Sequence, residues 1–226
     1  MGELMQMPLF PLNTVLFPGM VIPLHIFEPR YRLLVRDVAQ ERAPFGVALI
    51  REGSEVGGPA TPHDVGTSAY ITHIQQLPGG RMNIHSVGFR RFRIHKLEHD
   101  RPYLTALVED FPLEDPGTPE STALANRLSN ELRLFLGTFA HATQTDLNLE
   151  QLPDSGEELA YLAAIAMPLP MQEKQELLEA SDLTALLKVE RALLRREWML
   201  LQYMIDSPGA SPGSDDSPET SLFSPN

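Results

Sequence analysis

The residues best suited to chemistry form one cluster, Phe-Arg-Arg-Phe-Arg at positions 89–93. Aromatic rings can stack on bases and guanidinium groups can bind phosphates, so this cluster could form an RNA-binding strand. Strand alternation divides it, however, because Arg91 and Arg93 would share a face with Phe89 and leave Arg90 on the other. We therefore expect Arg90, Arg91 and Arg93 to be mainly structural, paired with Glu28 or another carboxylate.

The sequence shows no motif for the hydrolysis of ATP or of peptide bonds. The phosphate-binding pattern G-x-x-x-x-G-K-[S/T] does not occur in the sequence. A serine–lysine peptidase dyad would have to use one of the chain's three lysines, Lys96, Lys174 or Lys188. The first falls in a strand near a hairpin and the other two on helices among acids, with no constellation of nucleophile, base and oxyanion donors. We expect the chain not to be an enzyme and to use no cofactor.

The seven histidines raise the question of a metal site, because His85, His95 and His99 fall on neighbouring predicted strands. No pair has the helical H-x-x-x-H context of a metalloprotease, and the chain has no cysteine to complete a zinc site. Histidines on strand surfaces are usually solvated polar positions, so we expect no metal.

Charge and composition limit the partners. Thirty acidic against 18 basic residues give a formal charge of −12. Such a surface repels polyphosphate, so nucleic acid is an unfavoured partner. Apolar residues make up 42% of the chain, as in globular proteins, without the run of about 20 that a spanning helix needs. The N-terminus lacks the pattern of a signal peptide and cysteine is absent, so we expect a cytoplasmic protein without a membrane partner.

The stretch from Met7 to Leu34 organises the first half of the chain. Prolines and a Pro-Gly pair interrupt three short apolar runs, which therefore predict edge strands and corners of a small, bent sheet or barrel. Glu28-Pro29-Arg30 then begins a helix whose apolar face starts at Tyr31. Because a carboxylate inside an apolar run needs a partner, we expect Glu28 to contact an arginine of strand 90–93 or a backbone amide.

Alternating apolar segments and turn signals predict six or seven strands with one inserted helix before residue 112. Residues 51–64 are rich in glycine and proline and predict an exposed loop. The composition then shifts to Pro, Asp, Glu and Gly at residues 112–119, which we interpret as a domain boundary.

Helical periodicity dominates the rest of the chain and predicts a bundle over residues 118–205. Thr118-Pro119 starts one helix and Ser155 has capping-box spacing to Glu158. Trp198 lies on a leucine stripe and is expected to be largely buried. Residues 206–226 are rich in Ser and Pro and predict a disordered tail. The predicted division is a β-domain over 1–112, the bundle, and this tail.

The segment PLFPLNTVLFPGMVIPLHIFEPRY resembles the opening of the LON substrate-binding domain, the N-terminal region of Lon-type ATP-dependent proteases, in its stand-alone bacterial form. The resemblance continues through Gly66-Thr67, residues 88–94 (GFRRFRI), Met167-Pro168-Leu169 and residues 174–179 (KQELLE). It departs at Ala185-Leu186, where the family tends to carry an arginine.

This resemblance implies an α+β fold: a small PUA-like bent β-sheet or pseudo-barrel with one inserted helix, followed by an α-helical bundle. It also implies a non-enzymatic module that recognises unfolded or tagged polypeptide, with a protease or chaperone as a further partner. Glu28, Arg30, Tyr31, Arg90, Arg91 and Arg93 are the candidate structural or binding positions.

We expect the binding groove at the junction of β-domain and bundle, near the 51–64 loop and the first helix. Two alternatives are an RNA-binding PUA-like protein and a sensor of small molecules or peptides. The second alternative is based only on the LON-fold part of the cereblon substrate receptor.

Overall fold

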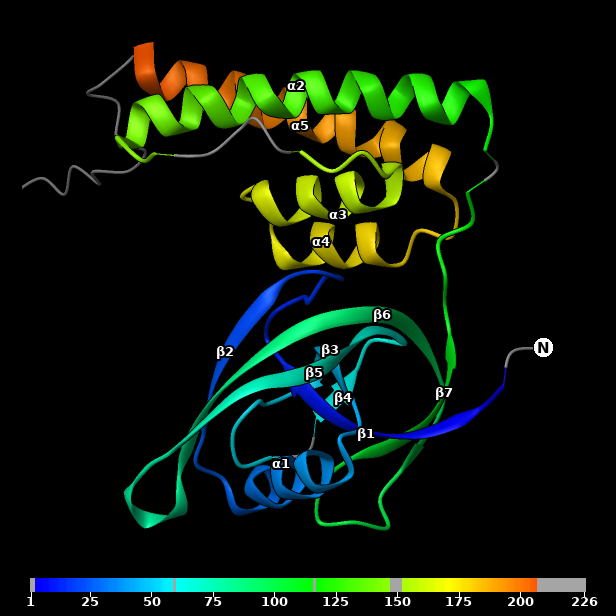
Figure 1. Cartoon of the computed structure of the whole chain (residues 1–226), viewed down its shortest axis with the longest axis vertical. Helices are drawn as coiled ribbons and strands as arrows, with labels where there is room; N and C mark the ends of the chain where they lie inside the picture. Colours follow the sequence, from blue (N-terminus) through cyan, green and yellow to red (C-terminus); the bar gives the residue numbers. More distant parts are fainter. Residues whose placement is uncertain (1–2, 59, 116, 147–151, 207–226) are drawn as a thin grey trace, which may run out of the picture.

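The computed structural model describes residues 3–58, 60–115, 117–146 and 152–206. Its strands and first helix form a barrel region, residues 5–110, and its last four helices a helical region, residues 119–206. The two regions are stacked along the long axis of the molecule, with α1 at the far end of the barrel region (Figure 1). None of the helices described here is long and apolar enough to cross a membrane.

The barrel region is a mostly antiparallel sheet that closes on itself. Five strands form a ring in the order β1, β7, β6, β5, β3, and a parallel pairing between β1 and β3 closes it. Strand β2 adds to the outside of β6 and the short β4 to β3. The bounds are Met5–Leu12 (β1), Val21–Ile26 (β2), Phe45–Gly53 (β3), Ala60–Pro62 (β4), Val65–Gln76 (β5), Met82–Glu98 (β6) and Thr105–Asp110 (β7). The predicted α+β pseudo-barrel is thus confirmed.

The apolar run after β1 is a buried corner of the barrel region. Val15, Leu16 and Phe17 are almost fully buried although they form no strand. The Thr67 hydroxyl donates to the Leu16 carbonyl oxygen at 2.6 Å, and so satisfies a polar group that no ladder pairs.

Helix α1, Pro29–Glu41, covers one end of the barrel region. Its buried side chains, Tyr31, Leu34, Val35 and Val38, are those that the helical spacing predicts. The Tyr31 ring stacks on Phe10 of β1, with 3.9 Å between the ring centroids. The helix ends at Arg42, which adopts the left-handed conformation with φ 52°.

The helical region comprises α2 (Pro119–Thr143), α3 (Gly156–Ala166), α4 (Met171–Leu178) and α5 (Leu183–Asp206). Helices α2 and α5 lie side by side and run in the same direction, with the shorter α3 and α4 between them and the barrel region (Figure 1). The predicted caps form: the Thr118 side chain accepts a hydrogen bond from the Ser121 amide at 3.1 Å, and that of Ser155 from the Glu158 amide at 3.4 Å.

Trp198 packs against the helical core together with Leu201, as predicted, although part of its side chain stays exposed. Beyond it, Leu201 still packs against this core, while Met199, Leu200, Tyr203 and Met204 of α5 are exposed. The predicted tail begins inside α5, which includes Asp206, and residues 207–226 lie outside the described residues.

The two regions share one hydrophobic core. Val15, Phe17, Leu49 and Val65 of the barrel region belong to the same buried cluster as the leucines of α2, α3 and α5. The division into two domains at residues 112–118 therefore stays a prediction.

Candidate functional site: a groove between the barrel and helical regions

The site begins at an irregularity in β6. Residues 89 and 90 lie together opposite Ser68 of β5, whereas Arg91 is again in register with Thr67. This extra residue is a β-bulge, which bends the strand and redirects its side chains. The Ser68 hydroxyl fixes it by accepting from the Arg90 amide at 3.2 Å and donating to the Arg90 carbonyl oxygen at 3.0 Å. The simple alternation expected across positions 89–94 is therefore wrong at Phe89 and Arg90.

Arg91 extends from β6 into the helical region and is 3% exposed. Its Nη1 donates to the carbonyl oxygens of Leu178 at 2.7 Å and Ala180 at 2.5 Å, at the C-terminal end of α4. A cation at a helix C-terminus satisfies free carbonyls and complements the helix dipole. Burial lowers the pKa of the Arg91 guanidinium, and Tyr161 and Glu157 partly oppose this shift. Arg91 thus joins the two regions.

Two further side chains of α4 strengthen this junction. Gln175 is buried, and its Nε2 donates to the Val65 carbonyl oxygen of β5 at 3.0 Å. At the end of the same helix, Glu179 lies 3.4 Å from the ring nitrogen of His63, which follows β4. Helix α4 is therefore the element that fixes the helical region on the barrel region.

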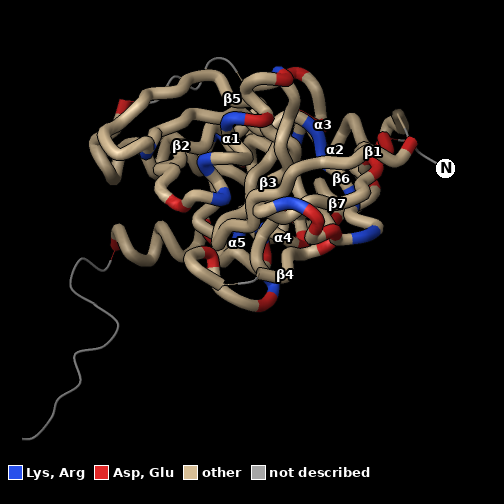
Figure 2. The backbone as a smooth tube through the Cα atoms, turned by 90° about the horizontal axis from the view of Figure 1, so that it is seen from below, with Lys and Arg blue, Asp and Glu red and all other residues tan. Residues whose placement is uncertain are grey.

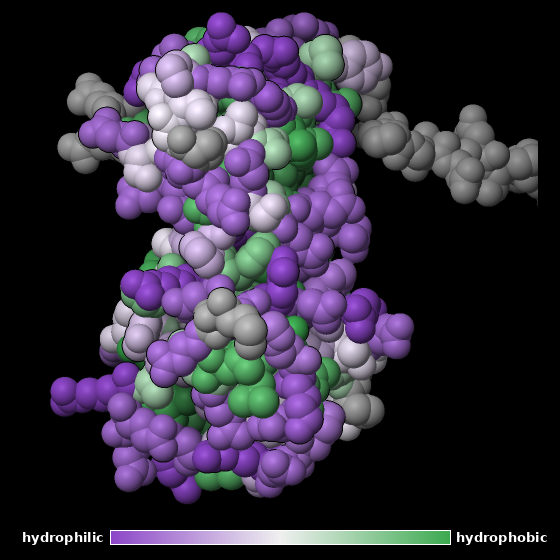
Figure 3. Space-filling view, turned by 90° about the vertical axis from the view of Figure 1, so that its right-hand side faces the viewer, coloured by the Kyte–Doolittle hydropathy of each residue, from purple (hydrophilic) through white to green (hydrophobic). Residues whose placement is uncertain are grey.

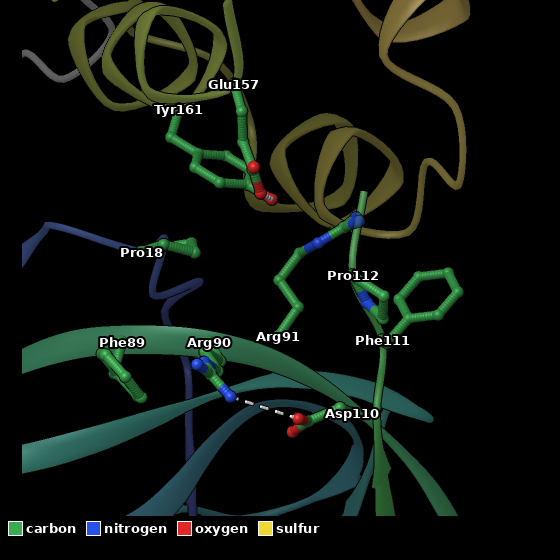
Figure 4. A pocket seen from close by; sticks show the side chains of 9 residues that line it. All are labelled: Pro18, Phe89, Arg90, Arg91, Asp110, Phe111, Pro112, Glu157 and Tyr161. Carbon is green, nitrogen blue, oxygen red and sulfur yellow. Dashed lines mark hydrogen bonds and ion pairs between the residues drawn. The ribbon is translucent and has the colours of Figure 1, made fainter. Parts of the chain in front are cut away.

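Arg90 and Arg93 have different surroundings from Arg91. The Arg90 side chain is 65% exposed, lies 4.9 Å from the Phe89 ring centroid and pairs with Asp110 at 3.4 Å (Figure 4). The Arg93 guanidinium stacks on Phe111 at 4.1 Å. Arg90 thus pairs with a carboxylate, whereas Arg91 contacts backbone carbonyl oxygens instead of the carboxylate predicted for it. Glu28 is a partner of none of the three.

Two adjoining hollows form a groove between β6 and α3. The smaller, of about 260 Å³, is drawn in Figure 4; its lining residues are Pro18, Phe89, Arg90, Arg91, Asp110, Phe111, Pro112, Glu157 and Tyr161. The larger, of about 640 Å³, shares Pro18, Phe89, Arg90, Glu157 and Tyr161 and extends along Pro153, Glu158 and Leu162. We call the two together the junction groove. Its lower wall is the bulge of β6, and its upper wall is the first two turns of α3 (Figure 4).

The upper wall of the junction groove carries a hydrogen-bonded pair. The Tyr161 hydroxyl donates to the exposed Glu157 carboxylate at 3.0 Å. Burial is the main cause of the raised pKa of Tyr161, which therefore keeps its proton at physiological pH. The groove thus presents an aromatic wall with a carboxylate at its rim.

The lower wall exposes aromatic surface. Phe89 is 50% exposed, and Tyr70 of β5 packs edge-on against it with 5.4 Å between the centroids. An exposed pair of aromatic rings beside a groove is typical of surfaces that bind another molecule.

The other three candidate residues lie elsewhere. Arg30 donates to Glu28 at 3.1 Å and to the carbonyl oxygens of Gly58 and Glu55, between β3 and β4. Its guanidinium also lies 4.6 Å from the centroid of the Tyr31 ring. The Gly57 amide donates to the same carboxylate at 3.3 Å. The expected contact of Glu28 is thus to a backbone amide and to Arg30, not to strand 90–93.

These contacts correct the expected position of the site. The predicted 51–64 loop is wrong at both ends, because β3 extends to Gly53 and β4 covers Ala60–Pro62. His63 contacts Glu179 at the junction, whereas the turn between these strands contacts Glu28 and Arg30 at the start of α1, which lies at the end of the barrel region remote from the other helices (Figure 1). A separate hollow of about 400 Å³ lies there, lined by residues that include Arg30, Tyr31 and Arg101. The junction groove and the α1–loop cluster are therefore two places rather than the single one predicted.

The lysines and histidines weighed for catalysis and metal binding have other contacts. Lys96 and Lys188 pair with acids and Lys174 donates to the Ile165 carbonyl oxygen at 3.3 Å. His95 contacts Glu109 at 2.9 Å, and His85 lies against His73. Over the described ranges, no three His, Asp or Glu residues are placed to hold a metal ion.

Two further views show how charged positions and apolar surface are distributed over the molecule. Seen from below, Lys and Arg positions are interspersed with Asp and Glu positions (Figure 2). A space-filling side view shows two lobes with a narrower waist, and apolar patches on both (Figure 3).

The closed barrel region, the inserted α1 and the helical region are the architecture of Lon N-terminal domains. The Lon N-terminal domain protein of Xanthomonas campestris superposes with a TM-score of 0.62 at 29% identity, over 83% of this chain and 98% of that one. The N-terminal domain of Mycobacterium avium complex Lon protease gives 0.67 at 25%, over 84% and 98%.

The family model for the ATP-dependent protease La (LON) substrate-binding domain matches residues 6–196, so the chain belongs to this family. The Lon protease of Anaeromyxobacter dehalogenans is 32% identical over 209 residues, 89% of this chain but 24% of the relative. Lon protease 2 of Myxococcus xanthus is 32% identical over 89% of this chain and 25% of its own length. The chain thus spans about a quarter of these relatives and matches their substrate-binding domain.

The structure adds residues to the site that sequence reasoning missed. Tyr161, Glu157, Asp110 and Pro18 line the junction groove but come from three separate segments, α3, β7 and the turn after β1. The capping signal at Ser155 located the start of α3, yet no local pattern shows which surface a helix faces. Arg90 and Arg91 were the members of this site that the sequence singled out.

Proposed function

We propose that this chain binds unfolded or tagged polypeptide in the junction groove, as a recognition module without catalytic activity of its own. Membership of the LON substrate-binding family supports the general role. The observation that carries the proposal is the half-exposed ring of Phe89, which lines a groove of about 640 Å³ and packs on its other side against Tyr70, outside the groove. Exposed aromatic rings beside a hollow give a bound chain an apolar anchor.

The groove is suited to a chain rather than to a compact ligand. Its larger hollow is elongated past the smaller one, along the first turns of α3. Pro18 and Pro153, which have no backbone N–H, stand on its walls, so side-chain contacts would supply much of the binding. Its polar groups at Arg90, Glu157 and Glu158 could meet the backbone and polar side chains of the bound chain.

The RNA-binding alternative is less favoured by the same contacts. Arg91 is buried against α4, and Arg90 is paired with Asp110. Arg93 is stacked on Phe111. The cluster at 89–93 therefore offers phosphate no group of free guanidinium side chains, and the chain carries a net charge of −12.

A binding measurement with one pair of variants tests the proposal. Fluorescence anisotropy with labelled, unfolded casein peptides would compare the protein with Phe89→Ser and with Phe139→Ser. Phe139, on α2, is 41% exposed and lies outside the groove, so its variant is a matched control. We expect Phe89→Ser to weaken binding by about tenfold, since an aromatic anchor is worth more than ~1 kcal/mol. Equal loss in both variants would contradict the assignment to this groove.

The same preparation tests the non-enzymatic role. We expect neither ATP turnover nor peptide cleavage, because the chain contains no P-loop and matches the substrate-binding domain of its relatives. Casein degradation by protein purified from a strain without Lon protease would refute this part.

A further inference from the structure

Negative and positive charges around the junction groove do not balance. Arg90 and Asp110 neutralise each other across 3.4 Å. Glu157 and Glu158 remain; both are exposed, and neither forms a salt bridge among the described residues, although the Arg91 guanidinium attracts Glu157 at longer range. Arg91, the other cation of the lining, is 3% exposed and engaged with α4. The surface that a bound chain would touch is therefore net negative.

The Glu157 carboxylate is held at the groove, and Glu158 is its neighbour on the same helix. They occupy the first turn of α3, whose start Ser155 caps. The Tyr161 hydroxyl also holds the Glu157 carboxylate at 3.0 Å, and a phenol that keeps its proton donates to this group without neutralising its charge. Carboxylates at a groove attract Lys and Arg and repel Asp and Glu.

The volume of the smaller hollow limits the size of the group that can bind beside these carboxylates. Its volume of about 260 Å³ is below the range of about 300–1,000 Å³ of sites for whole small ligands. Pro18, Phe111, Pro112 and the Tyr161 ring form much of its wall (Figure 4). Such a hollow has room for one large apolar or aromatic side chain, with Glu157 at its rim and Glu158 on the adjoining larger hollow.

We propose that the junction groove selects polypeptide segments in which a bulky apolar or aromatic residue is flanked by Lys or Arg. This inference rests on the proposed function and narrows it to one class of segment. The aromatic residue enters the smaller hollow beside Phe89, and the basic residue meets Glu157 and Glu158. Segments in which acids flank the same aromatic residue are rejected.

Three labelled peptides of equal length test this selectivity by anisotropy at low salt. One carries Phe flanked by Lys and Arg in a Gly-Ser background, the second has Glu at the basic positions, and the third has Ser in place of Phe. We expect the basic peptide to bind about tenfold more tightly than the acidic one, and the difference to shrink in high salt. The peptide without Phe should bind more weakly than the first.

Variants of the protein test whether Glu157 and Glu158 cause the preference for the basic peptide. The double variant E157Q/E158Q keeps hydrogen-bond acceptors and should reduce the preference for the basic peptide to about threefold or less. E120Q/E176Q removes the same charge from α2 and α4 outside the groove and should leave the preference unchanged. Circular dichroism would show that both variants are folded.

The outcomes separate this inference from the function on which it rests. If the aromatic peptides bind equally whatever their charge, the groove binds polypeptide but the selectivity is refuted. An equal fall in preference in both double variants would likewise refute it, because the effect would come from net charge alone. If none of the peptides and no unfolded casein binds, the proposed function fails as well.

Discussion

The barrel region and the helical region bury polar groups in different ways. In the barrel region, Thr67, Ser68 and Thr105 are buried with their hydroxyl groups hydrogen-bonded to backbone oxygens; the Ser86 hydroxyl and the Nε and Nη2 atoms of Arg91 are exceptions in the described part of the chain. In the helical region, Glu190 of α5 is 0% exposed, and neither carboxylate oxygen has a partner in the described part of the chain. The Trp198 indole nitrogen is also buried without one.

This difference affects the stability of the two regions. A buried polar group without a partner costs about 1–3 kcal/mol, and a carboxylate more, whereas a satisfied one is close to neutral or favourable. The closed ladder of the barrel region satisfies its own backbone, while α5 carries a carboxyl in its apolar stripe. We therefore expect the helical region to open first, and hydrogen exchange of α5 to be faster than that of β5 and β6.

The largest effect is expected where the two regions meet. Arg91→Ala removes two charge-assisted hydrogen bonds and leaves the Leu178 and Ala180 carbonyl groups without them. Hydrogen bonds to charged groups contribute about 1.5–3 kcal/mol each, so we expect unfolding free energy to fall by about 3 kcal/mol. Urea unfolding measures this change.

Arg90→Ala is the matched control for this measurement, because Arg90 is the neighbouring arginine and is mostly exposed. Surface ion pairs contribute about 0–1 kcal/mol, so this variant should be nearly as stable as the original protein. If both variants lose the same stability, Arg91 is not the link that joins the regions.

Helices and strands with a strong apolar periodicity could be predicted from the sequence, but the way in which they pack against one another could not. The buried face of α1 and the starts of α2 and α3 follow from apolar spacing and capping residues, which act within a few positions. The bulge at Phe89 and Arg90 depends on Ser68, about twenty residues away, so an alternation rule applied to β6 alone misplaces both side chains. For the same reason the groove residues Tyr161 and Asp110 gave no local signal.

The contacts of the α1–loop cluster show a related limit. Glu28 was expected to need a partner because of its apolar surroundings, and it has two. Which partner it finds depends on the path of residues 51–64, and glycine- and proline-rich sequence leaves that path open. The sequence therefore predicts that the Glu28 carboxylate needs a partner, but not which group that partner is.

The next prediction concerns Glu190 and pH. Burial raises the pKa of this carboxyl well above its ordinary value. The native state therefore keeps a proton that the unfolded state loses above about pH 4.3, and its stability falls as pH rises until the native pKa is passed. Each pH unit in that window costs about 1.4 kcal/mol.

The variant Glu190→Gln lacks this titration and isolates it. We expect its stability, relative to that of the original protein, to increase by up to about 2.7 kcal/mol between pH 5 and pH 7. Urea unfolding at several pH values checks the slope. A constant difference over this range would show that Glu190 is ionised or hydrated in the native protein.

Trp198 gives a smaller effect that tests how far the helical core extends along α5. Full burial would predict a loss of about 3–5 kcal/mol for Trp198→Ala, but partial burial should reduce this to about 2 kcal/mol. Trp198→Phe keeps much of the packing and removes the unpartnered N–H, so it should cost less than about 0.5 kcal/mol. Emission at the red limit with ready acrylamide quenching would instead indicate that the end of α5 stands free of the core.

The smallest effect expected is at the cap of α3, and it links stability to the groove. Ser155→Ala removes a hydrogen bond of 3.4 Å to the Glu158 amide and should cost about 0.5–1 kcal/mol. Thr118→Ala removes the equivalent bond from α2 and should cost a similar amount. Because α3 alone carries Glu157 and Glu158 at the groove, only Ser155→Ala should also weaken binding of the basic aromatic peptide. Equal peptide affinity in the two cap variants, at equal loss of stability, would show that the first turn of α3 does not contribute to the recognition surface.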